Sequence, residues 1–228
     1  MTDRATALVV GALFITATVA FSLSIVLLEP VLGTTDFLTQ VSRSNTRVAA
    51  GVLLELVNHV AVVGIAVVIY PVLRKFSGRL ALGYVAGRSI EAVLFAIGTM
   101  HLLTLVFLSQ EFAAAGTPPA PHFETMAAVL LAGHDWDTAT LAFIAFGLGA
   151  LMLNYVLYRS RLVPRWISTF GLIAAGSILA ARLMLISGLE LSPAIVTGLD
   201  APIFLQEMVF AIWLIVKGFD ASVLAERS

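Results

Sequence analysis

The stretch Val48–Leu73, VAAGVLLELVNHVAVVGIAVVIYPVL, decides the fold class. Its strongly polar side chains are Glu55, Asn58 and His59, and a basic segment follows it. An α-helix rises about 1.5 Å per residue and the hydrocarbon core of a bilayer is about 30 Å thick, so about 20 mostly apolar residues cross it. The stretch is therefore predicted to be a transmembrane helix.

Five further stretches have the same character. They are residues 5–28, 80–109, 138–158, 164–186 and 202–224. Of the 228 residues, 60% are hydrophobic and 12% are charged, whereas about a quarter of the residues of a soluble domain are charged. We therefore predict an all-α membrane protein of one domain, residues 1–228. It is a bundle of six transmembrane helices in the cell (plasma or inner) membrane, with the lipid bilayer as its partner.

Charge and cysteine content exclude several classes of function. The formal net charge of −1 offers no basic face, so no nucleic acid is expected as a partner. The chain has no cysteine, which excludes disulfides, thiolate metal sites and cysteine nucleophiles.

Residues 123–134 have two interpretations. The apolar side chains Phe123, Met126, Ala127 and Leu130 recur at helical spacing and form one stripe. They fit an interfacial helix that lies on the membrane before the fourth span, and they fit equally the first turns of a long fourth helix.

Lysine and arginine gather in alternate connections between the predicted helices. The second and fourth connections are basic and the C-terminal end carries Lys217, whereas the third connection and the fifth, with Glu190 and Asp200, are acidic. Only the first connection departs from this alternation, because it holds Arg43 and Arg47. Basic loops stay in the cytoplasm, so the N-terminus and the C-terminus are both predicted to be cytoplasmic. Two termini on one side of the membrane require an even number of spans, and six is even.

Several ionisable side chains fall inside the predicted helices, where a charge costs roughly 2.5–3.5 kcal/mol even on lenient scales. Glu55, Asn58 and His59 share one face of the second helix, and Arg88 and Glu91 form an i, i+3 pair in the third. We therefore predict an intramembrane polar pocket in the middle to outer half of the membrane. Its candidate residues are Glu55, Asn58, His59, Arg88, Glu91, His101, His134, Arg182 and Glu207.

The buried charges do not balance. The carboxylates of Glu55, Glu91 and Glu207 face the arginines Arg88 and Arg182. If both arginines pair with these carboxylates, one carboxylate remains, and it must be protonated, pair with a charged histidine or bind a cation. The three carboxylates form one shared site only if their side chains converge.

A metal site is one interpretation of the second helix. Glu55 and His59 lie one turn apart, and His101, Glu207 or the run 134–137 could complete a ligand set. The plainer interpretation is a hydrogen-bonded cluster that fixes helix packing. No H-E-x-x-H motif is present, and no metal or cofactor is assigned. The run 134–137, HDWD, also suits the interfacial start of a helix, because tryptophan favours the interface and aspartates favour a helix N-terminus.

Eight short sequence motifs follow one another along nearly the whole chain. They are ELVN at 55–58, YPVL at 70–73, GY at 83–84, RSIEA at 88–92, HDW at 134–136, YRSRLVPRWI at 158–167, QEM at 206–208 and WLIVKGF at 213–219. In this order they resemble the multi-pass prokaryotic membrane proteins grouped as domain of unknown function 4386. The resemblance implies a six-span membrane fold and no biochemical role. His59 and His101 lie outside the family pattern, which argues against a metal site built on them. The resemblance therefore favours these residues as the site: Glu55, Asn58, Arg88, Glu91, His134 and Glu207.

Three hypotheses about function follow. The leading one is a bundle whose polar pocket binds or moves a small molecule, a lipid or a proton. The second is a membrane-embedded enzyme, metal-assisted or not, that acts on lipid, and the third is a non-catalytic interaction or sensing subunit. Six spans are few for a transporter and no inverted repeat is evident, so transport would require a homodimer.

Overall fold

The computed structural model describes residues 2–115 and 121–226, and within these ranges the protein is helical without a strand. Six helices are long and apolar enough to cross a membrane, which confirms the predicted number of spans. The elements are α1 (Asp3–Leu32), α2 (Phe37–Arg43), α3 (Asn45–Leu73), α4 (Gly78–Ala115), α5 (Pro121–Asp135), the π-helical turn η1 (Trp136–Leu141), α6 (Ala142–Ser160), α7 (Arg165–Ile186), α8 (Pro193–Val216) and α9 (Ala221–Ala225).

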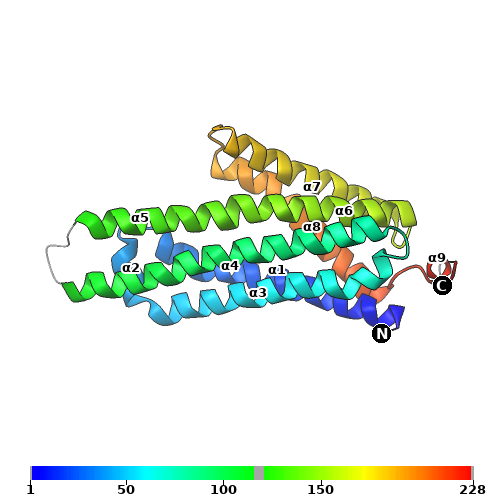
Figure 1. Ribbon diagram of the computed structural model, residues 1–228, viewed down its shortest axis with the longest axis horizontal. Coiled ribbons are helices and arrows are strands. Elements are labelled where there is room, and N and C mark those ends of the chain that lie inside the picture. The colour runs from blue at the N-terminus through cyan, green and yellow to red at the C-terminus, as the bar shows by residue number, and fades with distance from the viewer. Residues whose placement is uncertain (1, 116–120, 227–228) are drawn as a thin grey trace.

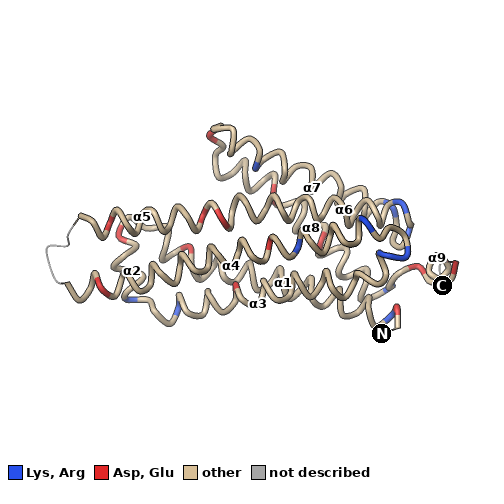
Figure 2. Tube along the Cα trace, in the orientation of Figure 1, with Lys and Arg blue, Asp and Glu red and all other residues tan. Residues whose placement is uncertain are grey.

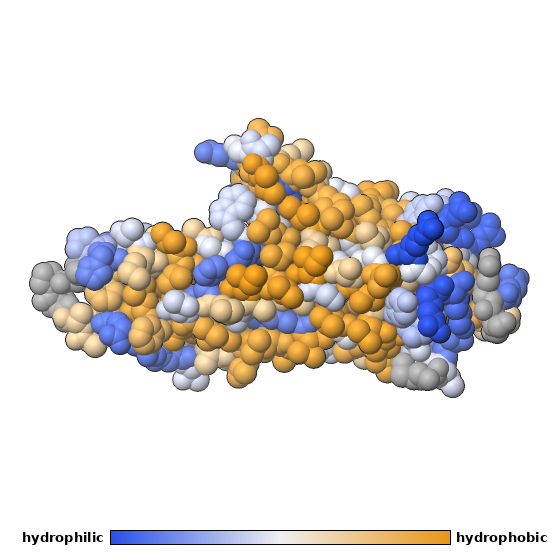
Figure 3. Space-filling model, in the orientation of Figure 1, coloured by the Kyte–Doolittle hydropathy of each residue, from blue (hydrophilic) through white to orange (hydrophobic). Residues whose placement is uncertain are grey.

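The helices form an elongated bundle with both ends of the chain at the same end (Figure 1). We call this the basic end, because the connections at 74–77, 161–164 and 217–220 meet there and Lys and Arg gather there (Figure 2). Hydrophobic side chains cover the middle of the visible face, as a lipid-facing surface requires (Figure 3). Val60, for example, is 75% exposed. The cytoplasmic location of the basic end stays a prediction.

The helices differ in length, and this difference shapes the molecule. The 38 residues of α4 extend about 57 Å at 1.5 Å per residue, about twice the hydrocarbon thickness. α5, η1 and α6 join into one equally long helix over Pro121–Ser160. Because α7 and α8 are shorter, α4 and α5 project past the α7–α8 hairpin, which diverges from them (Figure 1). Residues 123–134 belong to this long helix, and their location at a membrane surface stays a prediction.

Both predicted boundaries of the sixth span are wrong. The span was expected to run from about Pro202 to Leu224, but α8 begins at Pro193, contains Pro202 and ends at Val216. Proline is suited to the first turn of a helix, and Pro193 occupies that position. Asp200, which the sequence assigned to a loop, therefore lies two turns inside a transmembrane helix.

Arg47, one of the two arginines that depart from the charge alternation, has a structural role at the end of α1. Pro30 lacks an N–H group, so the carbonyl of Val26 has no donor four residues ahead. The Arg47 guanidinium donates to this carbonyl at 3.1 Å and to that of Leu27 at 2.7 Å. Arg4 acts similarly at the basic end, where it donates to the last carbonyls of α8.

A close approach of α4 and α6 fixes the depth of Arg88 in the core. A Cβ atom on Gly87 would lie 3.2 Å from the Cα of Gly149, so the two helices meet there without side chains between them. Tyr84 and Arg88, on either side of Gly87, extend into the bundle and are nearly fully buried. Small residues of this kind are the usual basis of tight helix packing in membranes.

Candidate functional site

A hollow among the helices, which we call the main cavity, has a volume of about 760 Å³. It lies between α1, α3, α8 and the junction of α5 with η1, and α7 adds Arg182 to its wall. At 1.5 Å per residue, Asp200, Arg182 and Glu55 lie about 24–27 Å from the basic end of their helices. These three residues therefore lie in the half of their own helices that is away from the basic end, and the location of the pocket within the membrane stays a prediction.

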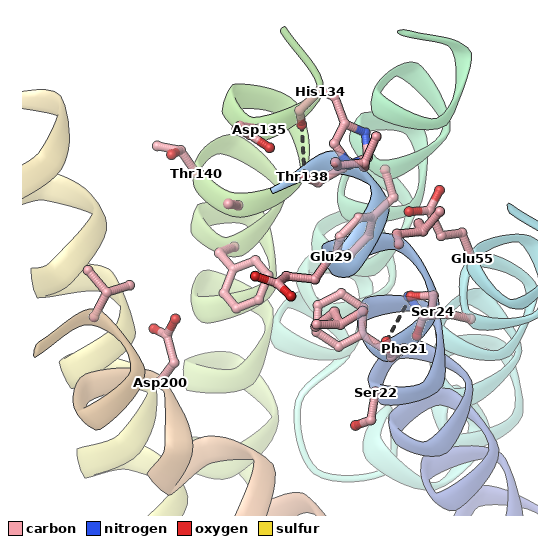
Figure 4. A pocket seen from close by; sticks show the side chains of 18 of the residues that line it. Phe21, Ser22, Ser24, Glu29, Glu55, His134, Asp135, Thr138, Thr140 and Asp200 are labelled. Carbon is pink, nitrogen blue, oxygen red and sulfur yellow. Dashed lines mark hydrogen bonds between the residues drawn. The ribbon is translucent and has the colours of Figure 1, made fainter. Parts of the chain in front are cut away.

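Acidic side chains outnumber basic ones in the main cavity. Its wall includes the carboxylates of Glu29, Glu55, Asp135 and Asp200, whereas Arg182 is its basic side chain. Glu29 and Asp200 enter from opposite sides, on α1 and α8, and Glu55 lies on α3 (Figure 4). The remaining wall is mostly apolar. With all four carboxylates ionised, the wall carries three more negative charges than positive ones.

Glu55 is held in place by a neighbouring helix. The Thr99 hydroxyl of α4 donates to Glu55 Oε2 at 2.6 Å and also donates to its own helix, at the carbonyl of Phe95. No ion pair forms at Glu55 within the described residues. The carboxyl group is therefore oriented by a hydrogen bond and not by an ion pair.

Arg182 pairs with Asp200 and with none of the three glutamates that the sequence offered as partners. Its Nη2 contacts Asp200 Oδ2 at 2.5 Å, and its guanidinium lies 4.6 Å above the centre of the Phe143 ring. This corrects the charge count. Four carboxylates face two buried arginines, because Asp200 joins Glu55, Glu91 and Glu207. The excess is two carboxylates, where the sequence alone counted one.

Below the main cavity, towards the basic end, lies a second group that we call the inner cluster: Tyr84, Arg88, Glu91 and Glu207. Arg88 Nη1 lies 3.1 Å from Glu91 Oε2 and 4.0 Å from Glu207 Oε1. The Arg88 guanidinium also lies 5.0 Å from the centre of the Phe146 ring. A small hollow of about 30 Å³ adjoins the two glutamates, which is room for about two water molecules by the usual requirement of about 10–15 Å³ each.

An aromatic layer separates the two hollows. It consists of Phe21, Phe95, Phe143 and Phe204, all of which line both hollows. The rings of Phe21 and Phe204 stack with their centres 5.9 Å apart, and Phe21 lies at the same distance from Phe95. Asn58 is the polar residue that lines both sides. Glu55 therefore does not converge with Glu91 and Glu207, and the three carboxylates occupy two levels.

The structure places the other candidate residues as follows. His59 lines the main cavity and stacks on Phe95 with ring centres 5.5 Å apart. His134 also lines it, and its Nδ1 lies 2.9 Å from the carbonyl oxygen of Gly98, which makes Nδ1 the protonated nitrogen. His101 lies outside both hollows and pairs with Asp137 at 3.1 Å. Within residues 2–115 and 121–226, no three His, Asp or Glu side chains are placed to hold a metal ion.

Three residues of the site were missed by sequence reasoning. Asp200 had a signal, because it precedes Glu207 by seven residues and so shares its helical face. Glu29 stands next to Pro30 and resembled the end of a helix. Thr99 had no signal, because threonine is common in membrane helices, where its hydroxyl can bond to its own backbone.

Comparison with known proteins agrees with the sequence resemblance. A relative from Archaeoglobus fulgidus, described as "Uncharacterized protein", is 30% identical over 78 residues. The match covers 34% of this chain and 44% of the relative, so the chain spans less than half the length of that protein. No solved structure matches the chain. The model of a family described as a domain of unknown function, DUF4386, matches residues 9–218, which include every residue of the two hollows. The chain is therefore a multi-pass membrane protein that belongs to the domain of unknown function 4386 family.

Proposed function

We propose that the protein binds a small organic cation with an apolar body in the main cavity. The observation that carries this proposal is the excess of carboxylates in a mostly apolar wall. Among the described residues, no ion pair forms at Glu29, Glu55 or Asp135, and Arg182 is already paired with Asp200. A cation in the cavity would offset charges that otherwise require protonation or water.

The remaining wall suits the apolar body of such a ligand. The faces of Phe21, Phe95, Phe143 and Phe204 provide apolar contact and also attract a cation through their ring quadrupoles. A volume of about 760 Å³ lies within the range of roughly 300–1,000 Å³ that small-molecule sites occupy. An anionic ligand of the same shape would face repulsion from the carboxylates.

The test compares three probes of one shape and different charge. The protein in lipid nanodiscs is titrated calorimetrically with phenylbutyltrimethylammonium, phenylbutanol and phenylbutanoate. We expect the cation to bind more tightly than the alcohol and the carboxylate to bind least. Glu55→Gln and Asp135→Asn should each weaken cation binding by about tenfold or more, since a hydrogen bond or contact to a charged group is worth roughly 1.5–3 kcal/mol.

A matched control is Glu111→Gln, which removes an exposed carboxylate of α4 that does not line the cavity. This variant should bind the cation like the wild type. Equal affinity for the three probes would refute the proposal, and so would equal losses in Glu55→Gln and Glu111→Gln.

Movement of the cation or of a proton across the bundle is a second candidate. The observation that favours it is the inner cluster, which lies beneath the main cavity with only the aromatic layer between them. In vesicles that contain the protein, Glu207→Gln should abolish uptake of phenylbutyltrimethylammonium and leave its binding intact. If vesicles with the wild-type protein take up no more cation than protein-free vesicles do, movement is rejected while the binding proposal stands.

A further inference from the structure

We propose a second binding site, at the basic end, for the phosphate of an anionic phospholipid headgroup. A hollow of about 540 Å³ lies there between the α6–α7 connection and the residues that follow α8. Its basic side chains are Arg161, Arg165 and Lys217. Figure 2 shows the gathering of Lys and Arg at this end of the bundle.

The backbone around this hollow is fixed by specific contacts. Arg161 ends α6 in the left-handed conformation, with φ of 60°. The N–H group of Asp220 donates to the carbonyl of Leu162 at 3.0 Å, which ties the segment after α8 to the α6–α7 connection. Gly218 allows the turn between them with φ of 78°. The three cations therefore project from two segments that are joined to each other.

The three cations have no anionic partner. Within the described residues, none of them forms an ion pair. Arg165 lies over the ring of Tyr158 at 5.0 Å, a stacking that uses the face of the guanidinium and leaves its N–H edge for an acceptor. Planar N–H pairs of this kind match the oxygens of a phosphate.

Helix α7 adds to the positive potential. Pro164 precedes its first turn and gives no side-chain cap. The Ile167 N–H donates to the Pro164 carbonyl at 3.0 Å, and the helix dipole gives the start of α7 a partial positive charge. Pro164 and Arg165 both line the hollow. The helix end therefore supports the anion preference that the side chains establish.

One carboxylate opposes an anion in this hollow. Asp220 also lines it and accepts hydrogen bonds from the Ser222 hydroxyl at 2.6 Å, the Ser222 N–H at 2.9 Å and the Val223 N–H at 3.4 Å. These bonds, led by that from the Ser222 hydroxyl, hold the pKa of Asp220 below its usual range, so it stays ionised at neutral pH. Three cations and one anion leave two positive charges for the ligand.

Aromatic residues indicate a lipid as the source of the phosphate. Trp213 and Phe219 line the hollow beside the cations, and Trp166 is exposed nearby in the first turn of α7. Tryptophan is enriched at the level of lipid headgroups, and basic pockets between helices on the cytoplasmic side are suited to phosphate headgroups. A free phosphate ion would use the cations but gain nothing from the aromatic wall.

The experiment is native mass spectrometry of the full chain in detergent, with dioctanoyl phosphatidylglycerol, dioctanoyl phosphatidylcholine and inorganic phosphate as probes. We expect phosphatidylglycerol to bind at least tenfold more tightly than phosphatidylcholine. A basic residue near an anionic surface is worth roughly fivefold in affinity. Replacement of Arg161, Arg165 and Lys217 by Gln together should therefore weaken phosphatidylglycerol binding about a hundredfold.

The control replaces Arg74, Lys75 and Arg79 by Gln, which removes three charges from the same end but none from the hollow. It should keep the preference for phosphatidylglycerol. Asp220→Asn should tighten binding by about fivefold, a gain that misfolding would not produce. Equal losses in the two triple variants would overturn the proposal, as would unchanged binding in Asp220→Asn. Displacement of the lipid by an equal concentration of inorganic phosphate would assign the hollow to the free anion instead.

Discussion

The replacement Asp200→Asn should destabilise the fold through the charge that it leaves behind. The Arg182 side chain is 2% exposed and that of Asp200 is 15% exposed, so their pair is buried on the arginine side. Asparagine keeps the size of aspartate and one carbonyl acceptor but removes the negative charge. The guanidinium then stays in the bundle against Phe143 without a counterion.

The expected cost is about 2–3 kcal/mol of unfolding free energy. Breaking a buried ion pair in soluble proteins costs roughly 3–5 kcal/mol, most of it from the unpaired partner. We expect the smaller cost of about 2–3 kcal/mol for Asp200→Asn, because asparagine still accepts a hydrogen bond and Asp200 borders the main cavity. Interhelical polar contacts in membranes average only about 0.6 kcal/mol, so a cost above that level must come from the unpaired charge. Adding Arg182→Met removes this charge and should restore part of the stability.

The assay is unfolding in mixed micelles of rising dodecyl sulfate content, followed by circular dichroism. Lys75→Gln serves as the control, because Lys75 and Asp3 form an exposed pair at 3.7 Å and such pairs contribute roughly 0–1 kcal/mol. If Asp200→Asn costs no more than Lys75→Gln, the pair does not stabilise the bundle. If the double variant is as unstable as Asp200→Asn or more so, the unpaired charge is not the cause.

Two further predictions concern helix packing and the orientation of Glu55. Gly87→Val should lower the unfolding free energy by about 1–3 kcal/mol in the same assay, since the added atoms would push α4 away from α6. Gly176→Ala should raise the unfolding free energy by up to about 1 kcal/mol through helix propensity, because a Cβ atom at that position meets nothing within 4 Å. Equal effects of the two glycine changes would contradict this packing. Thr99→Val should weaken binding of phenylbutyltrimethylammonium less than Glu55→Gln does, because it frees the carboxylate without removing its charge; a larger loss would show that the hydroxyl contacts the ligand.

The number of spans was predictable because a long apolar stretch of chain can cross a bilayer only as a helix in a protein of this kind. Every unpaired backbone group in hydrocarbon costs several kcal/mol, so long apolar stretches become helices. The boundary of the sixth span was not predictable in the same way. Both Pro193 and Pro202 could open a helix, and Asp200 between them reads as a loop residue on charge alone. Its ion pair with Arg182 makes burial tolerable, and that pair depends on how α8 packs against the preceding helix, α7.

The candidate site was predictable in its residue types and incompletely in its arrangement. Glu91 and Arg88 are neighbours on one helix, so their pairing follows from spacing. Glu207 reaches Arg88 only because α8 packs across the bundle, and nothing in the local sequence sets its rotation. The sequence left open whether Glu55 joins them, and it lies on the far side of the aromatic layer. Rotation of each helix about its axis is fixed by packing, and composition does not report it.

The two proposed sites share their helices. α7 carries Arg165 at the basic end and Arg182 in the main cavity, and α8 carries Asp200 and is followed directly by Lys217. The Arg182–Asp200 pair joins these helices at the cavity, while the hollow at the basic end lies between the start of α7 and the end of α8. A change in the tilt of the α7–α8 hairpin therefore alters the spacing of charges at both sites. If lipid phosphate at one end favours one tilt, the affinity of the cavity for its cation changes, and thermodynamic linkage requires the cation to change lipid affinity by the same factor.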